Sequence, residues 1–430
     1  MLPEILSGIP GPRSLDLARR LRAHESPNVT FLSPKFPVFW ERAEGANVWD
    51  VDGNRFLDVT SGFGVATAGY GRTELAAALG GQAAQLNHGM GDVHPTELKV
   101  RVCEGLSRVT FERWGLGSGK VLLGNSGFEA VEAALKTAAL VTGRPRVIAF
   151  RSGYHGLGFG SLAVTGLEAF QSPFRQQLAD LAEWAPFPAK AAEMPDAIHA
   201  VEALSRRRDI GAILVEPIQG RGGEIIPPKG FLPELRRIAD AAGILLIYDE
   251  IYTGFFRTGR FFACEYEKVY PDLICLGKAL TGCLPVSACV GRASVMDAWP
   301  VSTGEALHTS TFLGSPLGMR AVLESLAFWE QPGRDNEARL AEARWCEALA
   351  PLMASAKVRE IRGRGLLWGV ELKRKVAAGK LMESCLAEGL IVLGGGPLGN
   401  VLSLSPPLVM TPEQVAWAGQ CLGRSLRVAG

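Results

Sequence analysis

A lysine and an aspartate, each at the end of an apolar run, offer the clearest chemistry in this sequence. Lys278 follows the run DLICLG, and Asp249 closes the run ILLIYD earlier in the chain. A lysine amine can form a Schiff base with a cofactor aldehyde, and a carboxylate can keep a pyridine nitrogen protonated. Either residue alone is more often a surface charge, a turn residue or a helix cap. Together they are typical of a pyridoxal phosphate site.

Glycine, hydroxyl and aromatic residues follow other apolar runs. The segment GNSGFEA (124–130) leads into a helical pattern, and a helix N-terminus offers unpaired N–H groups to a phosphate. On its own this segment is more typical of an ordinary serine N-cap. In GYHG (153–156), Tyr154 could stack on a heteroaromatic ring, although a tyrosine in the core is the commoner case. Ser310 and Thr311 add hydroxyls beside glycine, a frequent feature of loops.

The elements that must position these residues alternate between strands and helices from about residue 60 to 320. Strands are expected at 121–123, 146–150, 211–217, 243–249, 272–276 and 285–291. Helices are expected at 126–142 and 231–242, each followed by glycine. This alternation predicts an α/β fold with a mainly parallel sheet covered on both faces. All the candidate residues then lie at or just beyond the C-terminal ends of strands, where open α/β sheets bind ligands.

The two ends of the chain differ from this pattern. NVWDVDGNRFLDV (47–59) predicts a hairpin that turns at Asp52-Gly53, and the C-terminal part mixes helices with short strands. We therefore expect a large cofactor-binding domain at 60–320 and a smaller α+β domain formed by residues 1–59 and 321–430.

The composition favours small-molecule chemistry. The 430 residues carry 45 Lys and Arg against 44 Asp and Glu, so no global field attracts nucleic acid or an anionic membrane. The 8 cysteines include no C-x-x-C pair, and no apolar stretch reaches the roughly 18 residues that cross a bilayer. The N-terminus lacks a signal-peptide pattern, so we expect a cytoplasmic protein with reduced thiols and no metal site.

In order and spacing these segments resemble one family, the class III (ornithine/4-aminobutyrate-type) aminotransferases of fold type I. The resemblance runs from PVFWERAEGANVWDVDGNRFLDV (37–59) to LSLSPPLVM (402–410) and includes EPIQG (216–220) and RGRGLLWGVEL (362–372). It implies the aspartate aminotransferase-like fold with a seven-stranded sheet in the large domain. It also implies pyridoxal 5'-phosphate as cofactor and a homodimer whose subunits share their active sites.

The resemblance assigns roles to individual residues. Lys278 forms the Schiff base with the cofactor, and Asp249 pairs with its ring nitrogen. The remaining cofactor contacts are Tyr154 on one ring face, Ile251 on the other, Ser126, Gly127 and Phe128 around the phosphate, and Thr311 reaching the phosphate of the neighbouring subunit. Trp40 and Phe63 fall in segments that line the substrate entrance in the family, although core packing is the commoner fate of such residues.

Three positions depart from the family pattern. Ser403 stands where the ornithine and 4-aminobutyrate branches have an arginine that grips the substrate α-carboxylate. Arg221 replaces the glutamate that follows EPIQG in those branches, and it could either hold a substrate anion or form a salt bridge at the pocket mouth. Tyr252 replaces a glutamine that bonds the cofactor ring oxygen, which leaves that contact open.

The expected activity is transamination between an amine or amino acid and a keto acid or aldehyde, by a ping-pong mechanism. Because the α-carboxylate arginine is missing, a racemase, epimerase or aminomutase on the same scaffold is the alternative. A third possibility, a non-catalytic binding module that has kept the cofactor, fits poorly with a sequence that retains both Lys278 and Asp249.

Overall fold

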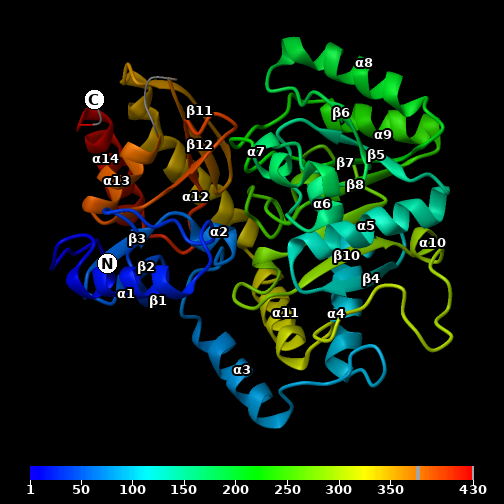
Figure 1. The fold of residues 1–430 in the computed structure, drawn as a ribbon, viewed down its shortest axis with the longest axis horizontal. Helices are drawn as coiled ribbons and strands as arrows, with labels where there is room; N and C mark the ends of the chain where they lie inside the picture. The colour runs from blue at the N-terminus through cyan, green and yellow to red at the C-terminus, as the bar shows by residue number, and fades with distance from the viewer. Residues whose placement is uncertain (374–377, 429–430) are drawn as a thin grey trace. The chain divides into compact units, whose positions relative to one another are not determined.

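The computed structural model describes residues 1–373 and 378–428. The chain divides into two compact units, one of Met1–Arg72 with Asn336–Gly430 and one of Thr73–Asp335 (Figure 1). The first unit therefore contains both ends of the chain, and the second unit is continuous in sequence.

The second unit is built on a seven-stranded sheet in the order β4-β10-β9-β8-β7-β5-β6. Its strands are β4 (Gly119–Gly124), β5 (Arg146–Phe150), β6 (Ala182–Ala185), β7 (Ile210–Val215), β8 (Leu245–Asp249), β9 (Leu273–Leu276) and β10 (Ser287–Arg292). Only β10 runs against its neighbours, so the sheet is mainly parallel as predicted. β6 was not anticipated from the sequence, because its four residues AEWA are too few to show a periodic pattern.

Helices cover both faces of this sheet, as a parallel sheet requires. The helices of this unit are α3 (Thr73–Gln85), α4 (Glu97–Ser107), α5 (Gly127–Thr142), α6 (Phe159–Ala163), α7 (Glu168–Gln171), α8 (Met194–Ser205), α9 (Phe231–Ala242), α10 (Ala293–Met296) and α11 (Pro316–Trp329). Alternate residues of β5 show the two faces: Val147 and Ala149 belong to the core under α5, whereas Phe150 packs edge-on against Phe231 of α9.

The two helices expected from the sequence end where it predicts. Gly143 after α5 and Gly243 after α9 adopt left-handed backbone angles, with φ of 66° and 61°. A residue with a Cβ is disfavoured in this conformation, and glycine is the usual choice at such a helix end.

The first unit contains two small sheets, of order β1-β2-β3-β13 and β11-β12-β15-β14. Their strands are β1 (Trp40–Glu44), β2 (Asn47–Asp50), β3 (Arg55–Asp58), β13 (Leu390–Ile391), β11 (Val358–Arg364), β12 (Leu367–Leu372), β14 (Leu393–Gly395) and β15 (Val401–Leu404). Its helices are α1 (Pro12–His24), α2 (Ser61–Gly64), α12 (Arg334–Leu349, which begins two residues before the unit boundary), α13 (Ala378–Ala387) and α14 (Pro412–Val428). The predicted hairpin is confirmed: β2 and β3 pair antiparallel, and Gly53 between them has a φ of 88°.

Candidate active site

The predicted catalytic residues gather at the C-terminal edge of the large sheet. Strands β4, β5, β7, β8 and β9 run in the same direction, so the segments that follow them meet at this edge. These segments are 125–128, 153–156, 216–221, 249–252 and 277–278.

Asp249, the last residue of β8, is buried and paired. It is 5% exposed, and its Oδ2 accepts a hydrogen bond from Nδ1 of His155 at 2.8 Å. Its Oδ1 accepts the N–H of Ile251 at 3.1 Å. Burial disfavours a charged ring in His155, but the hydrogen bond and the charge of Asp249, helped by Glu216, outweigh burial and raise its pKa. Asp249 thus favours the protonated form of His155, and the two side chains form a buried hydrogen-bonded pair at the end of β8.

Glu216 adds a second buried carboxyl group directly after β7. It is 6% exposed, and its two oxygens accept the N–H of Tyr154 at 2.9 Å and the N–H of Gly220 at 3.1 Å. Burial raises the pKa of Glu216 to about 7, against the opposing charge of His155 and with the help of Asp249. This carboxyl group thus joins the loop that carries Tyr154 to the turn that carries Arg221.

Lys278 follows β9 in a strained backbone conformation. Its φ is 47°, in the left-handed region that residues with a side chain seldom occupy. Its Nζ lies 4.7 Å from the centre of the Tyr252 ring. Burial lowers the pKa of the Lys278 amine, and the charge of Arg257 adds to this, while Asp249 and Glu216 oppose it. A larger share of the amine is therefore neutral and nucleophilic than in an exposed lysine.

The N-terminus of α5 is packed closely and has one unused polar atom. Ser126 is its N-cap, and the Ser126 Oγ is buried without a hydrogen-bond partner among the described residues. A Cβ on Gly127 would lie 3.0 Å from Ile251 Cδ1, and one on Gly277 would lie 3.2 Å from Ile251 Cγ2. Ile251 therefore packs between the α5 N-terminus and the residue before Lys278.

Two aromatic residues flank this edge. Phe128 packs against the loop after β5, where a Cβ on Gly156 would lie 2.4 Å from Phe128 Cβ. Tyr154, partly buried, meets Phe170 edge-on at 5.7 Å between ring centres. Arg221 is exposed, with its guanidinium carbon 5.7 Å from the centre of the same Phe170 ring. The predicted residues 126–128, 154, 221, 249, 251 and 278 are thus brought to one region of the second unit.

Three predicted residues are not part of that cluster. Thr311 is exposed, although the Oγ of its neighbour Ser310 accepts a hydrogen bond from Asn125 at 2.9 Å. Trp40 and Phe63 belong to the first unit, where they are 44% and 62% exposed. Trp40 packs edge-on against Tyr70 of that unit. Neither aromatic residue is buried in the core of its own unit.

His155, Glu216 and Arg257 are functional candidates that the sequence interpretation missed. His155 and Glu216 stand inside segments already quoted for the family resemblance, but no role was assigned to either. A signal existed for Glu216, because it closes an apolar strand just as Asp249 does. The fully buried Arg257 follows no such strand, so its position depends on the folded chain.

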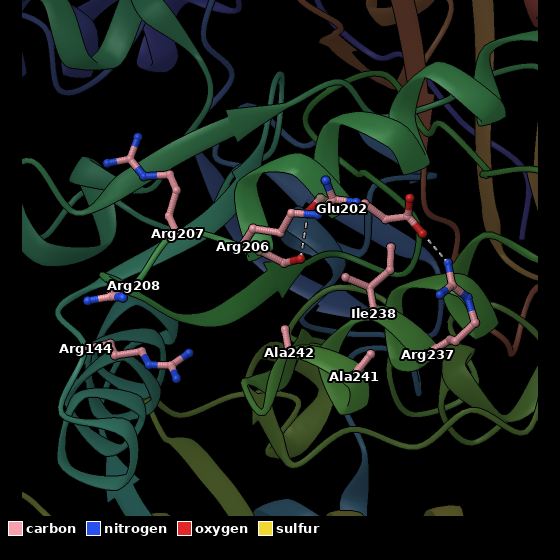
Figure 2. Close-up of a pocket in the computed structure, with 10 residues that line it drawn as sticks. Arg144, Glu202, Arg206, Arg207, Arg208, Arg237, Ile238, Ala241 and Ala242 are labelled. Carbon is pink, nitrogen blue, oxygen red and sulfur yellow. Dashed lines mark hydrogen bonds and ion pairs between the residues drawn. The ribbon is translucent and has the colours of Figure 1, made fainter.

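A pocket of about 530 Å³ lies at the opposite edge of the sheet, where α8 and α9 end (Figure 2). Its lining includes Arg144, Glu202, Arg206, Arg207, Arg208 and Arg237. The free carbonyl groups of a helix C-terminus favour cations nearby. Arg237 also pairs with Glu202 at 2.5 Å, and Arg144 donates to the carbonyl oxygen of Ile210 at 3.1 Å. Contacts with the helix ends and with neighbouring residues therefore explain why several of these arginines lie here.

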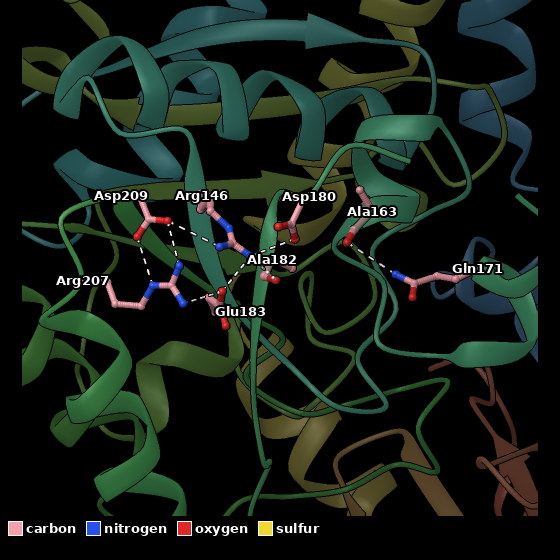
Figure 3. A network of polar contacts seen from close by, with 8 residues as sticks. All are labelled: Arg146, Ala163, Gln171, Asp180, Ala182, Glu183, Arg207 and Asp209. Atoms are coloured by element: carbon pink, nitrogen blue, oxygen red, sulfur yellow. Dashed lines mark hydrogen bonds and ion pairs between the residues drawn. The ribbon is translucent and has the colours of Figure 1, made fainter. Parts of the chain in front are cut away.

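A network of ion pairs beside this pocket also holds its charged side chains in contacts within the protein (Figure 3). Arg146 and Arg207 both contact Glu183, at 2.7 Å and 2.8 Å. Arg207 also pairs with Asp209 at 2.9 Å. The network ties β5 and β6 to the loop before β7, and we assign it to stability of the sheet edge.

Among residues 1–373 and 378–428, no cluster of three His, Cys, Asp or Glu side chains is suited to hold a metal ion. Within the same residues, no helix has the length and apolarity needed to cross a membrane.

Comparison with known proteins places the chain in a family. The model of the family described as "Aminotransferase class-III" matches residues 31–426. A 4-aminobutyrate aminotransferase of Mycobacterium leprae is 35% identical, over 98% of both chains. An acetylornithine aminotransferase of Methanopyrus kandleri is 36% identical, over 92% of this chain and 96% of the relative. An alanine/serine racemase of Pyrococcus horikoshii is 30% identical, over 99% of this chain and 93% of the relative.

A solved structure agrees with these matches. The ornithine aminotransferase of Toxoplasma gondii, described with PLP at its active site, superposes with a TM-score of 0.86 at 28% identity and covers 97% of this chain and 94% of its own. The chain therefore belongs to the class III aminotransferases, a family of pyridoxal phosphate-dependent enzymes of fold type I.

Proposed function

We propose that this aminotransferase moves an amino group from an amine or amino acid to a keto acid or aldehyde in a ping-pong sequence, with Lys278 as the residue that binds the cofactor. The observation that carries this proposal is the placement of a Lys278 amine of lowered pKa at the sheet edge that also holds the buried Asp249. The first substrate leaves as its carbonyl product before the second one binds.

The described residues fit the chemical groups of pyridoxal phosphate. The free Ser126 Oγ and the N–H groups at the start of α5 can hold a phosphate. The carboxylate of Asp249 is buried and oriented by His155, as a partner for a protonated ring nitrogen requires. Tyr154 and Ile251 lie on different segments of the same edge. The Tyr154 ring offers an aromatic surface to one face of the cofactor ring, and Ile251 offers an apolar surface to the other. When bound, the cofactor supplies an aldehyde that condenses with amines and a ring that withdraws electrons from the substrate Cα.

The residues of the chain divide the remaining work. Lys278 Nζ can accept the proton from the substrate Cα, because its lowered pKa leaves part of the amine neutral. Asp249 would keep a proton on the ring nitrogen of the cofactor, and the hydrogen bond from His155 orients the Asp249 carboxylate for this. Glu216 positions Tyr154 through the backbone N–H of that residue.

Labelling of the lysine tests this assignment. Protein loaded with pyridoxal phosphate and treated with borohydride should keep the cofactor on the peptide that contains Lys278, as read by mass spectrometry. Lys278→Ala should lose both the label and all turnover, whereas Lys136→Ala, an exposed lysine on α5, should keep both. Attachment of the cofactor to another lysine would show that the assignment is wrong.

An isomerase is a second candidate, supported by the 30% identity to the alanine/serine racemase. In that reaction the same molecule receives the proton back, so no carbonyl co-substrate is consumed. Chiral chromatography of single amino acids, with and without an added keto acid, separates the two. Loss of optical activity without a keto acid would favour the isomerase.

We further propose that the enzyme is a homodimer in which Thr311 of each subunit reaches the cofactor phosphate of the other. The exposure of Thr311 supports this arrangement, because a second copy can approach it. Light scattering of the purified protein gives the oligomeric state, and a monomer that is active would exclude shared sites.

A further inference from the structure

Arg221 stands in a closed turn at the edge of the proposed active site. Gln219 and Ile225 exchange backbone hydrogen bonds of 3.1 Å and 2.9 Å across the turn. Inside it, the N–H groups of Gly223 and Glu224 both donate to the carbonyl oxygen of Gly220, at 2.8 Å and 3.0 Å. These bonds fix the backbone from which the Arg221 side chain extends.

The glycines on both sides of Arg221 are held between two other parts of the site. A Cβ on Gly220 would lie 2.3 Å from Cδ1 of Tyr252, and one on Gly222 would lie 2.7 Å from the carbonyl oxygen of Ser152. Tyr252 is the ring that faces Lys278 Nζ at 4.7 Å. The turn therefore packs against the Tyr252 ring on one side and against the loop that leads to Tyr154 on the other.

The charge of Arg221 has no acidic partner in the described parts of the chain, residues 1–373 and 378–428. Its guanidinium lies by the Phe170 ring, which contacts Tyr154 edge-on. Burial raises the pKa of the Tyr154 phenol, and the positive charge of Arg221 partly opposes this rise. One explanation for an arginine at this position was a salt bridge at the pocket mouth. Arg221 forms no such salt bridge with the described residues of its own subunit. The cation remains available to a ligand at the site.

We propose that Arg221 is the residue that selects substrates with an anionic tail, by binding a carboxylate that is separated from the reacting carbon. The inference rests on the proposed function. The Tyr252 ring contacts both Lys278 Nζ and the turn that carries Arg221, so the turn and the lysine belong to one site. A guanidinium offers two parallel N–H donors to a carboxylate, and the aromatic ring beside it limits its orientation.

Two matched ligand series test the inference in the loaded enzyme. ω-Amino acids are compared with n-alkylamines of the same chain length, and kcat/KM is measured for each. Arg221→Gln should lower the ratio of acid to amine activity by about ten- to hundredfold, the effect of one charge-assisted contact. Arg221→Lys should restore part of the ratio, since it keeps the charge but loses the paired donors.

A binding measurement and a control variant complete the design. Calorimetry with glutarate, an unreactive dicarboxylate, should show the same ten- to hundredfold weakening in Arg221→Gln. Arg260→Gln is the matched control, because Arg260 is also exposed with its guanidinium carbon 5.7 Å from an aromatic ring, that of Tyr266. It should change neither the ratio nor glutarate binding.

An unchanged ratio together with unchanged glutarate binding in Arg221→Gln would overturn the inference. An equal loss for acids and amines would overturn it too, because it would mean that Arg221 supports the turn and not the substrate. Failure of the proposed function looks different: the wild-type enzyme would transfer no amino group and borohydride would not label Lys278. In that case the glutarate measurement still decides whether Arg221 holds a carboxylate.

Discussion

Replacement of Glu216 by glutamine should make the stability of the protein less dependent on pH. The Glu216 oxygens accept N–H groups from Tyr154 and Gly220, and the carboxyl group is buried beside Asp249. A glutamine of the same shape offers only one carbonyl oxygen, so its NH₂ group must face one of the two N–H donors. At low pH, where Glu216 is protonated, Glu216→Gln should therefore destabilise the protein by about 1–3 kcal/mol.

The difference in stability between the wild type and Glu216→Gln changes as the pH rises. Glu216 has a pKa of about 7 in the folded chain against an ordinary value of 4.5, so the folded state binds this proton more tightly. Its contribution to stability is complete below pH 4.5 and is lost as the pH rises through 7. At about 1.4 kcal/mol per pH unit, the loss amounts to about 3 kcal/mol. Glutamine does not titrate, so the variant should equal or exceed the wild type above neutral pH.

Urea unfolding of the cofactor-free protein, at several values between about pH 5 and pH 8, measures this difference. Titrating groups that do not interact with Glu216 are common to both proteins and cancel when the two free energies of unfolding are compared, whereas His155, whose pKa Glu216 helps to raise, contributes to the measured difference. Glu347→Gln on α12, an exposed position, should differ from the wild type by a constant amount across the range. A difference between wild type and Glu216→Gln that is equally constant would refute the reasoning.

Two further substitutions separate chemistry from cofactor retention. Asp249→Asn should lower kcat by about 10²- to 10³-fold, since an uncharged amide no longer favours a proton on the cofactor ring. The same substitution should lower the pKa of His155, because this histidine loses its charged partner. Stopped-flow kinetics and histidine NMR measure the two effects, and near-normal turnover would contradict the role of Asp249. Ser126→Ala should weaken cofactor binding by about tenfold through loss of one hydrogen bond to phosphate. Ser126→Ala should leave the stability of the cofactor-free protein almost unchanged, because the Oγ has no hydrogen-bond partner among the described residues. If a dialysis titration gave Ser126→Ala and the wild type the same affinity for the cofactor, this hydroxyl would not hold the phosphate.

The sequence by itself determined the family, the fold class and the cofactor, and these predictions are confirmed. It also determined most of the local structure around the site. The strand Arg146–Phe150 has the predicted bounds, and α5 and α9 end at the predicted glycines. Local signals suffice here because apolar periodicity and positive-φ glycine depend on a few neighbouring residues. The roles of the individual site residues stay predictions.

The tertiary structure decided which distant residues meet and how burial changes their chemistry. The contact of His155 with Asp249 spans 94 positions in sequence, and the contact of Tyr154 with Glu216 spans 62. Such pairs depend on the order of the parallel strands, which crossover connections set and which no local pattern contains. Burial in the same folded edge raises the pKa of Glu216 and lowers that of Lys278. Both shifts arise from removal of water around a charge, and only the packed chain determines where water is removed.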